Sequence, residues 1–347
     1  MTTDESWVVN FPTLAHLHDK WVEAHCSVPQ GFNRGAPFQM SDWQFWCSAN
    51  HYKVKGSARW KPRNPMMNEA FAYRRSLIVG PQKSGKGPWS ATVVAIEAVG
   101  PSLYAGWADA GDGYACSDWG CGCGFEFEYE PGEPMGMPHP SPLIQLTATS
   151  EDQVDNVYSP LKTMIKNGPL ADLMFIREGF IRLPGDECRI DVVTASANSR
   201  LGNPLSFGLQ DENGLYTKAN KLTGVARTQR RGAAGMRGRT MQTTNCWDPA
   251  QDSDAQQTWE STVTDVFKFY EIPPAGLSWK NKRERREILK HVYRHSPWVS
   301  IDSIEAEAND LNQTDPAEAE RFFGNRLVTG AGTWLEDGLW EKAYARA

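Results

Sequence analysis

From Ser76 onward, short apolar or β-branched runs alternate with helical patterns, and this order limits the fold more than any other feature. Each predicted strand ends in polar residues, and the strands cover 76–80, 143–150, 189–196, 205–212 and 240–245. The helices predicted between them cover 90–99, 150–167 and 254–269. Such alternation is typical of an α/β protein with a mainly parallel central sheet flanked by helices. Ligands bind these sheets beyond the carboxyl ends of the strands, so the polar strand ends form the candidate site.

Three other regions depart from this alternation. Residues 1–75 are rich in aromatic and turn residues. Residues 105–141 are dense in glycine, proline and aromatic residues, and the alternation in "FEFEYE" predicts a β-hairpin insertion. The residues after 270 are helical and highly charged. We therefore expect a core over 1–270 that contains the insertion, followed by a helical subdomain over 271–347.

The composition places the chain among soluble globular proteins. Of its 347 residues, 40% are hydrophobic and 22% are charged, which is ordinary for that class. No apolar run approaches the ~18 residues of a membrane span. The start "MTTDESWVVNF" has no signal-peptide pattern, so a cytoplasmic location is expected. The net charge is −6, so any nucleic acid would have to bind a local basic surface.

Residues 77–90, "LIVGPQKSGKGPWS", indicate a buried strand that runs into a glycine loop and then a helix. Gly80, Gly85 and Lys86 have the G-x-x-x-x-G-K spacing of a phosphate-binding loop. The N–H groups of such a loop form an anion-binding nest, and the helix N-terminus adds its positive dipole end. Lys86 would reach the β- and γ-phosphates. Gly87 stands where a serine or threonine usually binds Mg²⁺. The alternative to a phosphate-binding loop is a glycine-rich turn with an exposed lysine.

Two further strands end in residues that suit nucleotide chemistry. In "LSFGLQDE", Asp211 would hold Mg²⁺ directly or through water, and Glu212 would polarise the attacking water. Adjacent carboxylates at a strand end are also common as solvated loop residues. In "TTNCWDP", Thr243, Thr244 and Asn245 would lie beside this site. Their alternative role is turn formation and helix capping, which threonine and asparagine also favour.

Together these segments resemble the ATPase domain of the tailed-bacteriophage large terminases, the motors that pump DNA into capsids. The matching pieces follow the family's order over roughly residues 35–335. Trp43-Gln44 resembles the adenine-recognising glutamine segment, and residues 148–165 resemble the strand and helix after the phosphate loop. Asp211-Glu212 resembles the magnesium aspartate and catalytic glutamate, and "TTNCWDP" resembles the motif that couples hydrolysis to movement. The loop that resembles the family's phosphate loop consists of Gly80, Pro81, Gln82, Lys83, Ser84, Gly85, Lys86 and Gly87.

The resemblance implies a P-loop NTPase of the additional-strand catalytic-glutamate class, with a helical C-terminal lid or linker. It implies an ATPase that uses ATP and Mg²⁺, with Glu212 and Lys86 in the reaction. Arg200, eleven residues before Asp211, matches an arginine that reaches a neighbouring subunit's ATP; the alternative is an ordinary loop arginine. The sequence departs from the family at Gly87, which leaves Mg²⁺ to Asp211, water, the phosphates or Ser84. It also departs at Lys83, where the family often has arginine.

The resemblance further implies partners and a location. The partners are double-stranded DNA, the portal protein, the small terminase subunit and other copies of the chain. The copies would form a ring, a pentamer on the portal, from subunits that can be monomeric in isolation. The location would be the host cytoplasm and, transiently, the portal vertex of the procapsid, without a membrane. The alternatives are a helicase-like or other nucleic-acid ATPase and a non-catalytic nucleotide-binding assembly module.

Full-length members of the family carry a C-terminal nuclease domain of the ribonuclease H class, which holds two metal ions on acidic strand ends. After residue 270 the acids have helical spacing instead, so nuclease activity is not expected from this chain.

An arginine-rich stretch and a cysteine group remain. Residues 226–240 contain no acid, and their glycines suit a loop that faces phosphates; the arginines are Arg227, Arg230, Arg231, Arg237 and Arg239. A contact surface between subunits or a solvated loop is the alternative. Cys116, Cys121 and Cys123 could offer thiolates to zinc, with His139 as a candidate fourth ligand. Their spacing is not that of a standard C-x-x-C pair, so a glycine-rich hairpin with reduced thiols is the preferred interpretation.

Overall fold

The structure is a computed structural model that describes residues 7–63, 65–149, 151–193 and 204–329. In this part of the chain an eight-stranded sheet forms the centre, in the order β12-β1-β11-β10-β6-β9-β8-β7. Its first six strands pair in parallel, and β8 and β7 are antiparallel to their neighbours. The strand bounds are β1 Arg75–Val79, β6 Leu143–Thr147, β7 Phe175–Arg177, β8 Phe180–Arg182, β9 Arg189–Val193, β10 Phe207–Asp211, β11 Arg239–Thr244 and β12 Val266–Tyr270.

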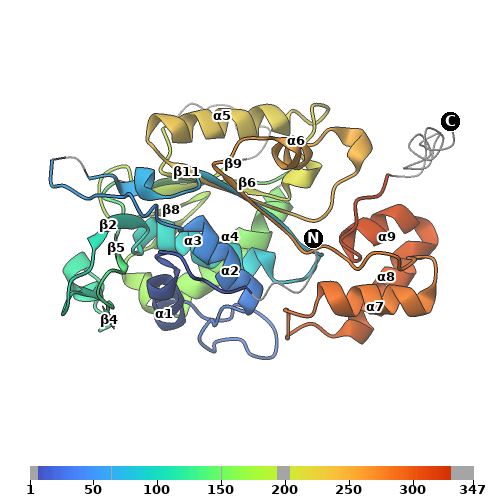
Figure 1. The fold of residues 1–347 in the computed structure, drawn as a ribbon, viewed down its shortest axis with the longest axis horizontal. Coiled ribbons are helices and arrows are strands. Elements are labelled where there is room, and N and C mark those ends of the chain that lie inside the picture. The colour runs from blue at the N-terminus through green and yellow to red at the C-terminus, as the bar shows by residue number, and fades with distance from the viewer. Residues whose placement is uncertain (1–6, 64, 150, 194–203, 330–347) are drawn as a thin grey trace.

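Helices cover both faces of this sheet (Figure 1). Helices α5 (Leu222–Gly235) and α6 (Asp254–Glu260) lie over one face. The other face is covered by α1 Ala15–His25, α2 Asp42–His51, α3 Lys86–Val99 and α4 Glu151–Lys166. The prediction of a mainly parallel α/β sheet flanked by helices is therefore confirmed.

The register of the central strands sets the position of the candidate site. Strand β11 lies between β1 and β10. Thr243 of β11 pairs with Ile78 of β1 on one side and with Asp211 of β10 on the other. Because these strands are parallel, their carboxyl ends meet at one edge of the sheet, as the sequence predicted.

Two local predictions were wrong. The helix predicted over 254–269 ends at Glu260, and β12 follows as an edge strand beside β1. The segment "VFKFY" is rich in aromatic residues, which favour strands once a sheet edge is available. The arginine-rich stretch predicted as a loop is mostly helix α5. Its buried residues Leu222, Val225, Ala226, Gln229 and Ala233 have helical spacing and form the face toward the sheet.

The insertion and the C-terminal helices flank this core. Two antiparallel pairs form the insertion, as predicted: β2 (Leu103–Trp107) with β5 (Pro134–Met137), and β3 (Gly113–Ala115) with β4 (Glu126–Glu128). The C-terminal helices are α7 Lys282–Val292, α8 Ile301–Thr314 and α9 Pro316–Phe322.

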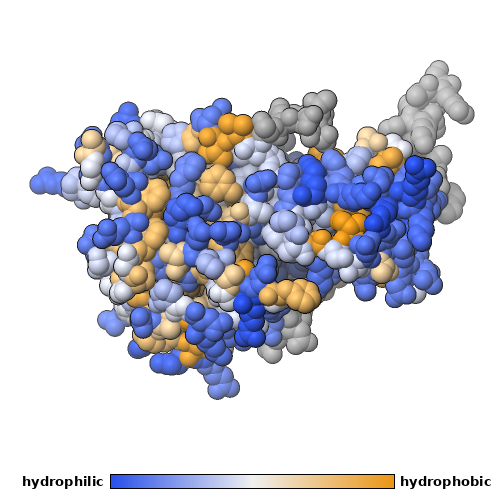
Figure 2. Space-filling model, turned by 90° about the horizontal axis from the view of Figure 1, so that it is seen from below, coloured by the Kyte–Doolittle hydropathy of each residue, from blue (hydrophilic) through white to orange (hydrophobic). Residues whose placement is uncertain are grey.

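Helices α7, α8 and α9 bury a hydrophobic cluster of their own, which includes Trp279, Ile288 and Phe323. Their surface is mainly hydrophilic on the face shown in Figure 2, whereas more hydrophobic residues appear on the rest of that face. The division of the chain into domains at residue 270 stays a prediction. Of the helices in the described ranges, none is long and apolar enough to cross a membrane.

Candidate nucleotide site

The glycine loop connects β1 to α3 at the carboxyl edge of the sheet. Gly85 precedes the first residue of α3 and has φ 97°, a left-handed conformation that favours glycine. Lys83, at the exposed tip of the loop, also has a positive φ of 65°. The loop is fastened to the sheet because the N–H of Gly80 donates to the carbonyl oxygen of Thr244 at 3.1 Å. The local pattern of strand, loop and helix is therefore the predicted one.

Lys86 lies buried beneath this loop. Its Nζ donates to the carbonyl oxygens of Gly80 and Pro81, both at 2.9 Å, and to the Oδ1 of Asn245 at 2.7 Å. Burial lowers the pKa of Lys86 from its ordinary value, while the charges of Glu212 and Asp211 act in the opposite direction. The ammonium group thus sits where the loop, β10 and β11 converge.

Asp211 is the last residue of β10, and Glu212 follows it at the same edge of the sheet. The hydroxyl of Thr243 donates to the Oδ1 of Asp211 at 2.6 Å. Burial, followed by the charge of Glu212, raises the pKa of Asp211 to about 7. Glu212 has a left-handed backbone with φ 52°, and its Oε2 accepts the N–H of Asn245 at 3.4 Å. This backbone conformation costs energy for a non-glycine residue, and residues that adopt it occur often at functional sites.

Asn245 thereby contacts both Lys86 and Glu212, whereas the side chain of Thr244 forms hydrogen bonds with backbone groups. The Oγ1 of Thr244 accepts the N–H of Gly214 at 3.0 Å and donates to the carbonyl oxygen of Asn245 at 2.8 Å. Of the three polar residues predicted at the end of β11, Thr243 and Asn245 touch the candidate site directly.

A pocket of about 350 Å³ gathers most of these residues. It is lined by the predicted Gln82, Lys83, Gly85, Lys86, Gly87, Asp211 and Glu212. Its walls also include residues that sequence reasoning missed: Gln30, Pro88, Asp155, Asn156, Pro160 and Trp298. This pocket combines buried and exposed cations with three carboxylates, those of Asp155, Asp211 and Glu212, which is suitable for a phosphate group with a divalent cation.

A second cavity of about 780 Å³ adjoins the first and shares four lining residues with it, Gln30, Gly85, Pro88 and Trp298. Apolar side chains such as Val28, Phe32 and Phe38 line it, together with the predicted Gln44. The Oε1 of Gln44 accepts the N–H of Ser41 at 3.0 Å in a capping box, and its Nε2 donates to the carbonyl oxygen of Gly85 at 3.4 Å. The two cavities together have a charged end and an apolar end.

The C-terminal helical region binds the outer side of the loop. The hydroxyl of Tyr293 donates to the carbonyl oxygen of Gln82 at 2.6 Å, and that of Ser296 donates to the carbonyl oxygen of Ser84 at 3.1 Å. The N–H of Gln82 donates to the carbonyl oxygen of Phe322 at 2.8 Å. The hydroxyl of Ser84 donates to the carbonyl oxygen of Pro81 at 2.8 Å. No local sequence signal relates Tyr293, Ser296 or Phe322 to the loop.

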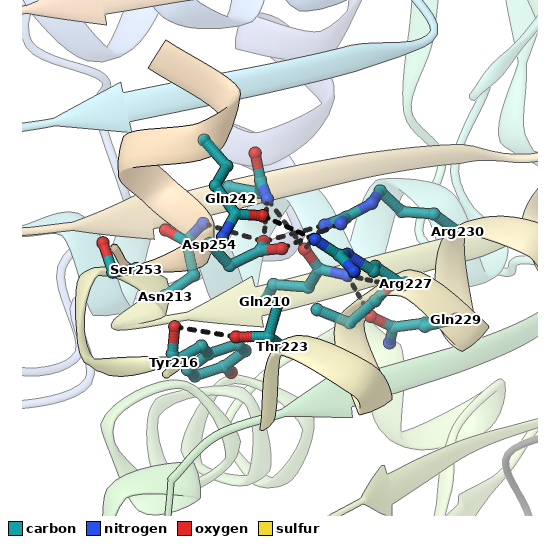
Figure 3. Close-up of polar contacts among 12 residues, drawn as sticks. Gln210, Asn213, Tyr216, Thr223, Arg227, Gln229, Arg230, Gln242, Ser253 and Asp254 are labelled. Carbon is teal, nitrogen blue, oxygen red and sulfur yellow. Dashed lines mark hydrogen bonds and ion pairs between the residues drawn. The ribbon is translucent and has the colours of Figure 1, made fainter. Parts of the chain in front are cut away.

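A buried polar network continues from the site toward α5 (Figure 3). At its centre, Asp254 accepts two hydrogen bonds of 2.8 Å from the guanidinium group of Arg230. It also accepts hydrogen bonds from the Nε2 of Gln242 at 2.8 Å and from the Nδ2 of Asn213 at 3.4 Å. Asn213 directly follows Glu212, so this network supports the backbone of the candidate base.

The five predicted arginines separate into different environments. Arg227, Arg231 and Arg237 are exposed, and Arg230 is engaged with Asp254. Arg239 is buried on β11 and ion-paired with Glu97 at 2.9 Å, which removes it from any surface that contacts DNA or a neighbour. A groove of about 870 Å³ nevertheless lies along α5, lined by the basic residues Arg74, Arg75, Lys221, Arg227, Arg230 and Arg231. Arg200 lies outside the described residues.

Comparison with known proteins identifies the fold. The large terminase of bacteriophage HK97 superposes with a TM-score of 0.61 at 15% sequence identity, over 95% of this chain and 58% of the HK97 chain. The chain has the fold of a bacteriophage large terminase. The predicted resemblance to this family is therefore confirmed at the level of structure.

Sequence relatives also come from phages. The Gene 13 protein of Mycobacterium phage L5 is 24% identical over 303 residues, and that of Mycobacterium phage D29 is 23% identical over 304 residues. The matches cover 78% and 79% of this chain but 47% of each relative, so the chain spans about half the length of the curated relatives it matches. No family model matches the sequence.

Proposed function

We propose that this chain hydrolyses ATP as the motor domain of a phage large terminase. The observation that carries the proposal is one pocket lined by Lys86, Asp211 and Glu212. A cation for phosphate, a carboxylate for a divalent metal and a second carboxylate for water are the groups that ATP hydrolysis requires. The position of β11 between β1 and β10 and the fold shared with the HK97 protein support a P-loop ATPase of the additional-strand catalytic-glutamate class.

ATP would occupy both cavities. The loop from Gly80 to Gly87 would bind the phosphates through its N–H groups and the start of α3. Lys86 would exchange its carbonyl partners for phosphate oxygens. The adenine would enter the apolar cavity, where the side-chain amide of Gln44 is already oriented by Ser41. Lys83, at the loop tip, would add a second positive charge near the phosphates.

Asp211 would hold Mg²⁺ through its carboxylate, whose Oδ1 accepts the hydroxyl of Thr243 at 2.6 Å. Bound Mg²⁺ neutralises negative charge on the phosphates. Glu212 would accept a proton from the attacking water. Asn245 contacts both Lys86 and Glu212, so its movement on hydrolysis would transmit a change from the phosphate side to β11. Arg200 from a neighbouring subunit would complete the site.

The wider assembly is proposed from the same resemblance. The chain would act in the host cytoplasm and at the portal vertex, with double-stranded DNA, the portal protein, the small terminase subunit and a ring of its own copies. The exposed Arg227, Arg231 and Arg237 are candidates for DNA or neighbour contact. The contacts of Tyr293 and Ser296 with the loop support a lid role for residues 271–347 above an ATPase core.

The decisive experiment measures ATP hydrolysis against protein concentration, with and without double-stranded DNA. Glu212→Gln should still bind ATP, but its hydrolysis should fall by about 10²–10⁴ because the base is lost. Glu187→Gln is the matched control, since Glu187 is another glutamate with a positive φ, of 62°, outside the site. Equal hydrolysis by Glu212→Gln and the unaltered protein would refute the assignment. Binding without hydrolysis in the unaltered protein would favour the assembly-module alternative.

A further inference from the structure

Four side chains that bind soft metal ions gather where the insertion meets α1. His25 is the last residue of α1, and Cys116, Cys121 and Cys123 lie between β3 and β4. The Nε2 of His25 is 3.4 Å from the Sγ of Cys116, 3.6 Å from that of Cys121 and 3.2 Å from that of Cys123. All four ligand atoms lie within 4.8 Å of one another. The polypeptide thus brings three thiols and one imidazole nitrogen to a single point.

These distances match a tetrahedral zinc site. Zinc–nitrogen bonds of about 2.0–2.1 Å and zinc–sulfur bonds of about 2.3 Å place the nitrogen and sulfur about 3.5 Å apart. The three nitrogen–sulfur distances of 3.2–3.6 Å surround that value. Three cysteines with one histidine are a donor set of structural zinc sites, and thiolates select zinc over Mg²⁺ or Ca²⁺.

The surroundings of His25 hold its ring in the orientation that a metal needs. The Nδ1 of His25 lies 2.7 Å from the carbonyl oxygen of Trp21, so Nδ1 carries the proton and the lone pair of Nε2 faces the sulfurs. The ring also stacks on Trp21, with ring centroids 4.2 Å apart. The N–H of Phe125 points to the Sγ of Cys123 at 3.4 Å, as expected for a donor that stabilises a thiolate.

We propose that His25, Cys116, Cys121 and Cys123 bind one structural Zn²⁺ ion that fastens the insertion to α1. Four protein ligands leave no open position for a substrate, so the site is structural. Strands β3 and β4 have three residues each, and a pair this short is not stable by itself. Binding of the ion releases the thiol protons and supplies free energy for folding of the insertion.

The structure also replaces the fourth ligand suggested by the sequence. His139 is not part of the four-residue group, and its Nδ1 accepts the N–H of Ser141 at 3.1 Å instead. His25 lies 91 residues before Cys116, so only the fold brings the two together. This correction supplies a matched control, because His139 is a histidine of the insertion that lies outside the group of four ligands.

The test measures the metal content of the full purified chain by elemental analysis. We expect about one zinc ion per chain, released when the thiols are modified. Cobalt substituted for zinc should give the strong visible absorption of tetrahedral cobalt bound to thiolates. His25→Ala and Cys123→Ser should weaken zinc binding by at least about 10–100-fold in competition with a chelator. His139→Ala and Cys188→Ser should retain the ion.

Proteolysis supplies a readout that does not depend on ATP. Chelation should expose residues 105–141 to cleavage, and added zinc should restore their protection. Metal-free protein in which all of these thiols react freely would overturn the proposal, as would a disulfide among them. Equal zinc content in His25→Ala and the unaltered protein would also overturn it. If a ligand variant fails to fold, the metal content and cobalt spectrum of the unaltered chain still decide the question.

Discussion

Gly87 lies so close to Asn156 that a Cβ on Gly87 would come within 2.3 Å of the carbonyl oxygen of Asn156. Helices α3 and α4 pack together at this point, immediately beside the glycine loop. A serine or threonine, which would restore the usual Mg²⁺-binding hydroxyl, carries the same Cβ. The departure at Gly87 therefore has a steric explanation, independent of whether the site is active.

Gly87→Ala should destabilise the protein by about 1–3 kcal/mol, because α3 and α4 must separate to accommodate the methyl group. Gly224→Ala is the matched control, since Gly224 lies in helix α5 and a Cβ added there would meet no atom within 4 Å. The control should be neutral or more stable, by up to about 1 kcal/mol. Thermal unfolding of the two variants checks the prediction, and a shift in the same direction for both would contradict it.

Arg239→Ala should be much more damaging than Arg237→Ala, although the two arginines lie close together in the sequence. The guanidinium group of Arg239 pairs with Glu97 at 2.9 Å, and both side chains are 1% exposed. Removal of one buried partner leaves an uncompensated charge and costs about 3–5 kcal/mol. Arg237 pairs with Glu69 at 3.2 Å with 62% and 49% of the side chains exposed, so its loss should change stability little. Chemical denaturation of both variants tests this contrast.

Local patterns predicted the elements that carry the candidate site. The apolar run before Gly80 and the glycine spacing up to Lys86 indicated the strand, loop and helix, because both signals lie within a few residues. The position of Asp211 and Glu212 at the carboxyl end of β10 was predicted for the same reason. Helix α5 was missed because glycines and arginines obscure a buried face that begins earlier, at Leu222.

Contacts between distant segments could not be predicted in this way. Tyr293 reaches the carbonyl oxygen of Gln82 across 211 residues of sequence, and His25 meets Cys116 across 91. Neither pair has a local signal, since each depends on how α7 and α1 pack on the rest of the protein. Sequence reasoning therefore predicted the strand, loop and helix but not the groups that enclose the loop.

Thr243→Val should raise the Mg²⁺ concentration needed for half-maximal ATP hydrolysis. Valine keeps the shape of threonine but cannot donate to the Oδ1 of Asp211, which Thr243 does at 2.6 Å. A hydrogen bond to a charged group contributes about 1.5–3 kcal/mol, so a shift of about tenfold or more is expected. Hydrolysis measured over a Mg²⁺ series checks this, with protein stability measured in parallel. An unchanged Mg²⁺ requirement would show that Asp211 does not need this donor.

Tyr293→Phe should weaken nucleotide binding by loosening the glycine loop while leaving every loop residue intact. The variant removes only the hydroxyl that donates to the carbonyl oxygen of Gln82 at 2.6 Å. A neutral hydrogen bond of this kind contributes about 0.5–1.5 kcal/mol, which corresponds to about a twofold to tenfold loss of affinity. Titration with a fluorescent ADP analogue gives the measurement.

Tyr104→Phe is the matched control for Tyr293→Phe. The hydroxyl of Tyr104 is buried in the insertion, away from the loop, and has no hydrogen-bond partner among the described residues. Removing a hydroxyl without a partner should not lower nucleotide affinity, so only Tyr293→Phe should shift the titration. If both variants bind the nucleotide equally well, the C-terminal helices cover the loop without changing its affinity for the nucleotide. If Tyr293→Phe alone binds more weakly, movement of α7 provides a route by which the helical region controls release of the nucleotide.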